Sequence, residues 1–176
     1  YYMETTDSAR SSPRHGKYPT AVTRLNNAGG AGQHLLAVLP LGNHDCQGVM
    51  TGWASPSISD PGFSLLPGSF ADHLTSYAGS FWTGSQTKMS AWITKGASGT
   101  AGTIEEPCNY SGKFPHPLLH VAYYKGVTLG EAWFRSTSFK PFQSLFLGDP
   151  LTRPYGSPPF VDLPGVPQNP VSGTIV

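Results

Sequence analysis

Residues 86–107, QTKMSAWITKGASGTAGTIEEP, decide the fold of this chain. Met89, Trp92 and Ile93 fall at i, i+3 and i+4, which places them on one apolar face of a helix. Gly96 predicts the end of that helix. The small residues after it have little side-chain bulk, which suits a buried strand crossed closely by a helix or by another backbone. The stretch therefore predicts a helix packed on a sheet.

The remaining patterns extend this into a three-layer α/β domain with a mostly parallel sheet and many loops. Strands are expected at 34–39, 46–53, 70–77, 99–105 and 142–148. Helices are expected at 86–95, 117–125 and 128–137. The last helix begins with a capping box, in which Thr128 precedes Glu131 by three residues.

The sequence predicts three parts of different character. Residues 1–33 are expected to be loop-rich, with one short helix around 20–25. Residues 34–156 form the α/β domain. Residues 157–176 are rich in proline and predict an extended tail.

Composition excludes several functions. Charged residues make up 12% of the 176-residue chain and the net charge is +1, so nothing favours nucleic-acid binding. No apolar run approaches the ~18 residues that a membrane span needs. The low charge, with many Ser, Thr, Gly and Tyr residues, favours a secreted protein, extracellular or periplasmic. We expect no cofactor and no metal site.

Cys46 and Cys108 are the two cysteines. In an oxidising compartment they could form a disulfide, which would close a loop of about 60 residues worth roughly 4 kcal/mol. The alternative is two unrelated buried thiols.

Several segments resemble a known family when taken together: PGSFADHLTSYAG (67–79), WITKGASGTAGTIEEPCN (92–109), KFPHPLL (113–119), GVTLGEAWFRS (126–136) and LFLGDPLTRPY (145–155). They are similar to the C-terminal half of uncharacterised exported bacterial proteins that are distantly related to the caspase-like cysteine peptidases, the gingipains among them. The resemblance covers about residues 46–156 and implies a caspase-like fold. It also implies that the Pro-rich tail leads into a β-sandwich module, which residues 171–176 would begin.

The resemblance also says where a catalytic dyad would lie. Caspase-like peptidases place His-Gly after one strand and Cys after the next, so that the imidazole can serve the thiolate. The first position here reads Thr51-Gly52 without His, and the second contains Ser76 without Cys. A serine needs a positioned base, and His73, three residues earlier on a strand, is expected on the opposite face.

An alternative dyad is His44 and Cys46, which would share one face of an extended strand at i, i+2. Nothing in the resemblance places a dyad there.

Three carboxylates and a histidine are further candidates. Asp72 and His73 could serve as a metal or acid–base site, although a structural hydrogen bond between them is the favoured interpretation. Glu105 and Glu106 leave the strand predicted at 99–105, where a sheet binds ligands. They could hold a cation together with Asp72, or one could act as a general acid. Otherwise they accept backbone N–H groups of the following loop.

Two functional hypotheses follow. The first is an exported, non-catalytic caspase-like domain, a pseudoenzyme that acts as a structural or assembly subunit. The second is an active caspase-like cysteine or serine endopeptidase that receives its missing partner from a second chain.

The expected partners are other protein chains. Residues 1–33 show no apolar strand, so one sheet edge is expected to be open. Residues 171–176 alternate like a lone strand, which predicts strand addition between chains through their termini.

Overall fold

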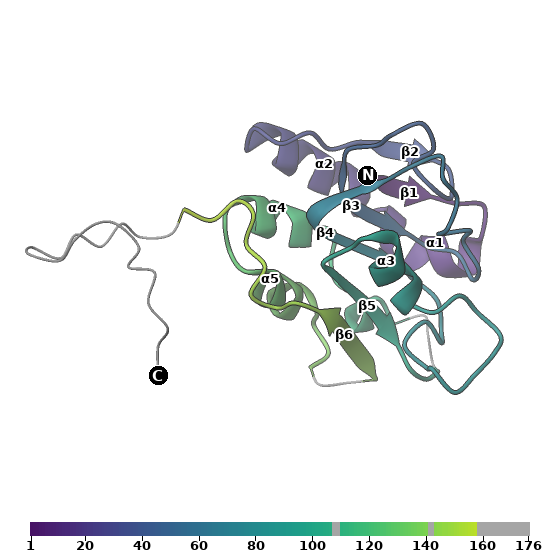
Figure 1. Cartoon of the computed structure of the whole chain (residues 1–176). Coiled ribbons are helices and arrows are strands. Elements are labelled where there is room, and N and C mark those ends of the chain that lie inside the picture. The colour runs from purple at the N-terminus through teal and green to yellow at the C-terminus, as the bar shows by residue number, and fades with distance from the viewer. Residues whose placement is uncertain (107–109, 141–142, 158–176) are drawn as a thin grey trace, which may run out of the picture.

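The chain forms an α/β fold around a six-stranded, mostly parallel mixed sheet (Figure 1). The computed structural model describes residues 1–106, 110–140 and 143–157. Five of the strands pair in parallel and the sixth is antiparallel, in the order β2-β1-β3-β4-β5-β6. The strands are β1 (Tyr2–Glu4), β2 (His34–Leu36), β3 (Cys46–Thr51), β4 (Leu65–His73), β5 (Gly99–Thr103) and β6 (Ser144–Gly148).

Five α-helices accompany the sheet in the described residues. They are α1 (Ser8–His15), α2 (Tyr18–Asn27), α3 (Ser90–Lys95), α4 (Leu119–Tyr124) and α5 (Leu129–Ser136). A short 3₁₀ helix covers Ser111–Lys113. None of the helices in this part of the chain is long and apolar enough to cross a membrane.

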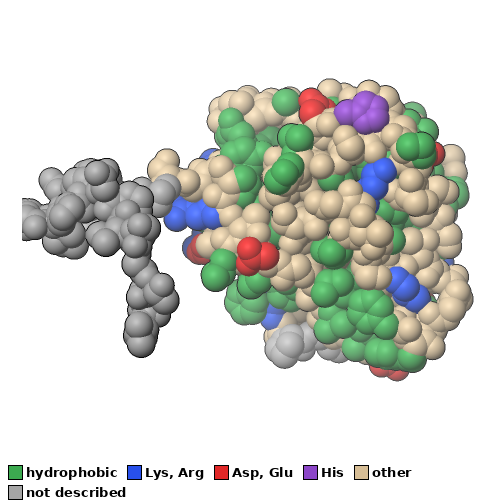
Figure 2. Space-filling view, in the orientation of Figure 1, with side chains coloured by type: hydrophobic (Ala, Val, Ile, Leu, Met, Phe, Trp, Pro, Cys, Tyr) green, Lys and Arg blue, Asp and Glu red, His purple; other side chains and the backbone are tan. Residues whose placement is uncertain are grey.

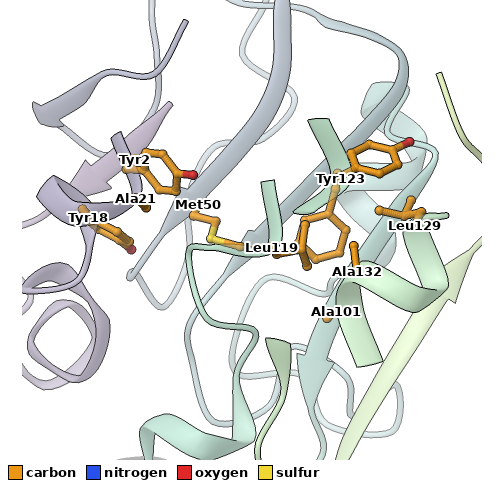
Figure 3. Packing of buried hydrophobic residues seen from close by; sticks show 10 residues of the cluster. Tyr2, Tyr18, Ala21, Met50, Ala101, Leu119, Tyr123, Leu129 and Ala132 are labelled. Carbon is orange, nitrogen blue, oxygen red and sulfur yellow. The ribbon is translucent and has the colours of Figure 1, made fainter. Parts of the chain in front are cut away.

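Two hydrophobic clusters lie on the two faces of the sheet. Successive residues of a strand point to opposite faces, so Met50 of β3 belongs to one cluster and Val49 to the other. The first cluster packs α2, α4 and α5 against the sheet (Figure 3). The second packs α3, through Trp92, together with Leu39, Ile58 and other loop residues. Helix α1 packs on β1 and belongs to neither cluster.

The prediction of a loop-rich segment at 1–33 is wrong. Two helices and a strand lie there, and β1 sits inside the sheet between β2 and β3. The strand is three residues long, too short to show a period, and α1 has Ser and Pro13 in place of strong helix formers. The helix expected around 20–25 is confirmed as part of α2.

The strand expected over the apolar run 34–39 is shorter and less buried than the sequence predicts. The run predicts a strand buried on both faces, but β2 covers only His34–Leu36 and lies at the end of the sheet, where the Leu36 side chain is 86% exposed. A continuous apolar run is typical of a central parallel strand. Here the strand stops at Leu36, and Leu39 turns onto one face of the sheet, where it joins the second cluster.

Within residues 86–107 lie the helix and the buried strand that the sequence predicts. Helix α3 begins at Ser90, later than the expected 86, and ends at Gly96, which has a φ of 111° and provides the left-handed C-cap. All five residues of β5 are buried. The Thr128 cap is confirmed as well, because its side chain accepts a hydrogen bond from the Glu131 N–H.

The other expected elements are present with shifted limits. Strand β4 begins five residues before the predicted 70 and ends at His73, and β3 ends at Thr51. Strand β6 is the antiparallel member of the sheet, paired with β5. The Pro-rich tail and the predicted β-sandwich start at 171–176 lie outside the described residues.

Small residues in β5 allow another backbone to approach it closely. A Cβ built on Gly102 would lie 2.8 Å from the Gly79 nitrogen and 3.0 Å from the Ala78 Cβ. The Gly79 N–H donates a hydrogen bond to the Thr103 carbonyl in the same contact. The sequence-based expectation of a backbone crossing is therefore confirmed.

We predict that Gly102→Ala lowers the free energy of unfolding by about 1–3 kcal/mol, because the added methyl group must push two backbones apart. Gly84→Ala is the matched control, since a Cβ there meets nothing within 4 Å. Urea denaturation followed by tryptophan fluorescence measures both. Equal unfolding midpoints for the two variants would show that the crossing is looser than described.

Candidate functional site

The carboxyl ends of the parallel strands are the usual ligand site of an α/β sheet, and here α1 lies across them. Residues 5–7 lead from β1 into α1, and the Thr5 hydroxyl donates to the Gly52 carbonyl (2.6 Å) just beyond β3. A Cβ on Gly52 would collide with the backbone carbonyl of Arg10. Helix α1 therefore touches the strand end that the resemblance marks as catalytic.

Arg14 of α1 fixes this arrangement through a buried ion pair with Asp72 of β4. The two guanidinium nitrogens donate to the two carboxylate oxygens at 2.7 Å each. One of them also donates to the Thr51 carbonyl at 2.8 Å. The side chains are 2% and 1% exposed.

Burial and the neighbouring charge both shift the pKa values of Arg14 and Asp72. Burial alone would lower the pKa of Arg14, but the Asp72 carboxylate and Tyr18 together outweigh it and raise that pKa above its ordinary value. Burial raises the pKa of Asp72, and the Arg14 guanidinium opposes that rise. Asp72 therefore has its acceptors filled and is held in place, which fits a structural role.

His73 is a neutral structural histidine. The Trp92 indole N–H donates to its Nδ1 (3.0 Å), so the ring proton lies on Nε2 and is donated to the Thr87 carbonyl (2.9 Å). Burial lowers the pKa of His73 to about 4. The expected hydrogen bond between His73 and Asp72 is wrong, because neighbouring residues of β4 point to opposite faces of the sheet.

Ser76 lies in the turn after β4 and is 2% exposed. The Thr103 hydroxyl bonds to the backbone carbonyls of Thr75 and Ser76, which anchors this turn on β5. His73 cannot activate Ser76, because both of its ring nitrogens are already engaged. Within the described residues no hydrogen bond joins the Ser76 hydroxyl to a base.

His44 and Cys46 lie at the opposite end of the sheet, where β3 begins. His44 is exposed in a bend outside the strand, with the Ser64 hydroxyl 3.4 Å from its Nδ1, whereas Cys46 is buried as the first strand residue. The predicted shared face is therefore wrong. Burial raises the pKa of the Cys46 thiol, which keeps it protonated and unreactive.

The predicted disulfide stays a prediction. Cys46 is a free thiol in the structure, and Cys108 lies outside the described residues.

Glu105 and Glu106 are exposed beyond β5. The backbone carbonyl of Glu105 accepts a hydrogen bond from the buried Lys113 ammonium (2.6 Å), which ties the strand end to the short 3₁₀ helix. Asp72 is bound to Arg14 and is not free to share a cation with the two glutamates. No group of three His, Cys, Asp or Glu residues in the described part of the chain is arranged to hold a metal ion.

A cluster at the carboxyl end of β1 was missed. The Glu4 carboxylate lies 2.6 Å from His15 Nδ1 and 3.0 Å from His34 Nε2, which ties α1, β1 and β2 together. The hydrogen bond from His15 is the main cause that lowers the pKa of Glu4. No sequence signal could have found it, because the three residues lie far apart in regions without periodicity.

Comparison with known proteins gives no match to this chain among family models, curated proteins or solved structures.

We predict that the buried histidines make the protein acid-sensitive. Burial lowers the pKa of His73 to about 4 and that of His120 to about 3, from an ordinary 6.5. Below pH 6.5 these two histidines bind protons in the unfolded chain, whereas in the native state they stay neutral. Stability is therefore complete above that pH and falls by about 1 kcal/mol per pH unit for each histidine as the pH drops towards 4.

Urea titrations between pH 7 and 5 measure this slope. His73→Gln should reduce it, whereas Met89→Leu, a change in the same buried region without a titratable group, should leave it unchanged. An unaltered slope in His73→Gln would contradict the neutral, buried state of this imidazole.

Proposed function

We propose that this chain is an exported, non-catalytic domain of caspase-like architecture that serves as a structural or assembly subunit. The observation that carries the proposal is the closed carboxyl end of the sheet, where α1 is held over β3 and β4 by the Arg14–Asp72 pair.

The contacts at this end support a non-catalytic domain. A caspase-like dyad would need His beside Gly52 and Cys near Ser76, but Gly52 is covered by the Arg10 backbone. The Arg10 guanidinium also donates to the Thr75 hydroxyl (2.9 Å), which in turn donates to Gln86 (2.8 Å). A substrate carbonyl would have to displace this network before it met a nucleophile.

The competing proposal, an active endopeptidase completed by a second chain, has less support. A second chain could supply a histidine, but Ser76 is buried. Cys46, the other candidate nucleophile, is buried at the far end of the sheet.

An assembly role is supported by the edge of the sheet at β2. Because β1 occupies an interior position, the edge expected from a missing N-terminal strand does not arise. Within the described residues, β2 pairs on one side only, with β1. Beside it runs a groove of about 600 Å³ lined by residues 35–41, Trp53 and Pro56, from which Leu36 and Leu41 protrude. An extended apolar segment would satisfy both features.

We infer that the segment added to β2 is residues 171–176 of a neighbouring copy, whose side chains alternate as a strand requires. Low charge also suits export to a crowded extracellular or periplasmic setting. The face in Figure 2 carries only scattered Lys, Arg, Asp and Glu side chains, so apolar and backbone contacts would dominate assembly.

The experiment is light scattering on the full chain, on a truncation that removes 164–176, and on Leu36→Lys. We expect the full chain to form oligomers and both variants to be monomeric, because one loses the added strand and the other places a charge on its docking edge. Leu151→Lys is the control, since Leu151 is 77% exposed away from β2. A monomeric full chain would rule out self-assembly through this edge.

The same preparations, tested on unfolded casein, address catalysis. We expect no hydrolysis above background for wild type or for Ser76→Ala. Hydrolysis that falls by more than about 100-fold in Ser76→Ala would establish a working nucleophile and overturn the non-catalytic proposal.

A further inference from the structure

A cavity lined by tyrosines lies at the amino ends of the strands, on the α2 and α4 side of the sheet and far from the closed end. Its volume is about 260 Å³. Five tyrosines contribute to its wall, together with Leu25, Leu66, Gly48 and His120. The tyrosines are Tyr1, Tyr2, Tyr123, Tyr124 and Tyr155.

The aromatic rings brace one another. Tyr155, from the segment after β6, packs edge-on against Tyr123 (centroids 5.8 Å apart, 87° between planes) and is tilted on Tyr124 (4.9 Å). On another part of the wall Tyr2 packs edge-on against His120 (5.6 Å). His120 itself fills the space above Gly48, where any Cβ would collide with the imidazole. The wall is therefore preformed rather than assembled around a ligand.

Several polar groups of this wall already donate their hydrogen bonds within the protein. The hydroxyls of Tyr2 and Tyr123 donate to the carbonyls of Pro117 (3.0 Å) and Gly68 (2.7 Å), and the Tyr1 hydroxyl donates to Asn43 (2.9 Å). His120 is neutral, because burial lowers its pKa to about 3, and its Nε2 faces the Phe70 carbonyl at 3.3 Å. An anion would find few donors here.

The charges on the cavity wall also favour a cation over an anion. Asp45, exposed at the start of β3, is the one charged side chain among the described residues that line the cavity, and none of them is Lys or Arg. The α-amino group of Tyr1 also lies at this wall, where it donates to the Gly48 carbonyl (2.7 Å), and burial lowers its pKa to about 6, so it is mostly uncharged above neutral pH. Tyrosine faces attract cations through the ring quadrupole, by about 0.5–2 kcal/mol per contact. A carboxylate at the rim adds attraction for the same charge.

We propose that this cavity binds a small organic cation with an apolar surface, such as a trimethylammonium group. The volume suits a ligand of that size, since an apolar cavity of about 150 Å³ already holds benzene. The tyrosine walls take the methyl groups, and Asp45 faces the positive charge at the entrance. Binding here is independent of the assembly role, because the β2 edge and this cavity use different residues, and each can fail alone.

The test compares choline with 3,3-dimethylbutan-1-ol, its uncharged counterpart of the same shape, by isothermal titration calorimetry on the full chain. We expect choline to bind at least about 10-fold more tightly. Equal affinity for the two would overturn the cationic preference, and the absence of choline binding at about 10 mM would overturn the site.

Substitutions in the cavity wall test whether choline binds there. Tyr155→Leu should weaken choline about 10-fold and Asp45→Asn by several-fold, with little effect on the uncharged compound. Both residues are partly or fully exposed, so the fold should persist, which circular dichroism verifies. The controls are Tyr110→Leu, an exposed tyrosine outside the cavity, and Glu131→Gln on α5. Losses in the controls as large as those in the cavity variants would contradict the proposal.

Discussion

The buried ion pair between Arg14 and Asp72 is the interaction on which the rest of the structure depends. Removing two charges from water costs several kcal/mol per ion, and only close, well-aligned contacts offset that cost. Here the ion pair is bidentate, and the guanidinium also donates a hydrogen bond to the Thr51 carbonyl. Because one partner comes from α1 and the other from β4, the pair fixes the N-terminal helix over the carboxyl ends of β3 and β4.

The two ends of the sheet differ in structure, because contacts cover the carboxyl ends of β3 and β4 whereas a cavity lies at the amino ends. At the carboxyl ends His73 is held by Trp92 and Thr87, and the backbone of the Ser76 turn is anchored by Thr103. At the amino ends a tyrosine-lined cavity remains between the helices. The proposed ligand cavity therefore lies at the end of the sheet opposite to the usual placement of ligands in parallel sheets.

Local signals predicted the centre of the fold well and its first third poorly. Gly96 and Thr128 mark helix limits through backbone geometry and capping, which neighbouring residues decide alone. Strand β1 is three residues long and gains its place from pairing on both sides, which no local pattern reveals. The Arg14–Asp72 pair spans 58 positions, so composition and spacing could not indicate it. The apolar run at 34–39 indicated a strand, but it did not indicate that this strand lies at the edge of the sheet.

The free energy of unfolding of Arg14→Met tests the closure most directly. Removal of one partner leaves a buried, unpaired carboxylate, so we expect a loss of about 3–5 kcal/mol. The double change with Asp72→Leu should be less destabilised than either single change. Arg135→Met is the control, because the Arg135–Glu131 pair is largely exposed and worth less than about 1 kcal/mol. A loss in Arg14→Met no larger than in Arg135→Met would contradict the central role of this pair.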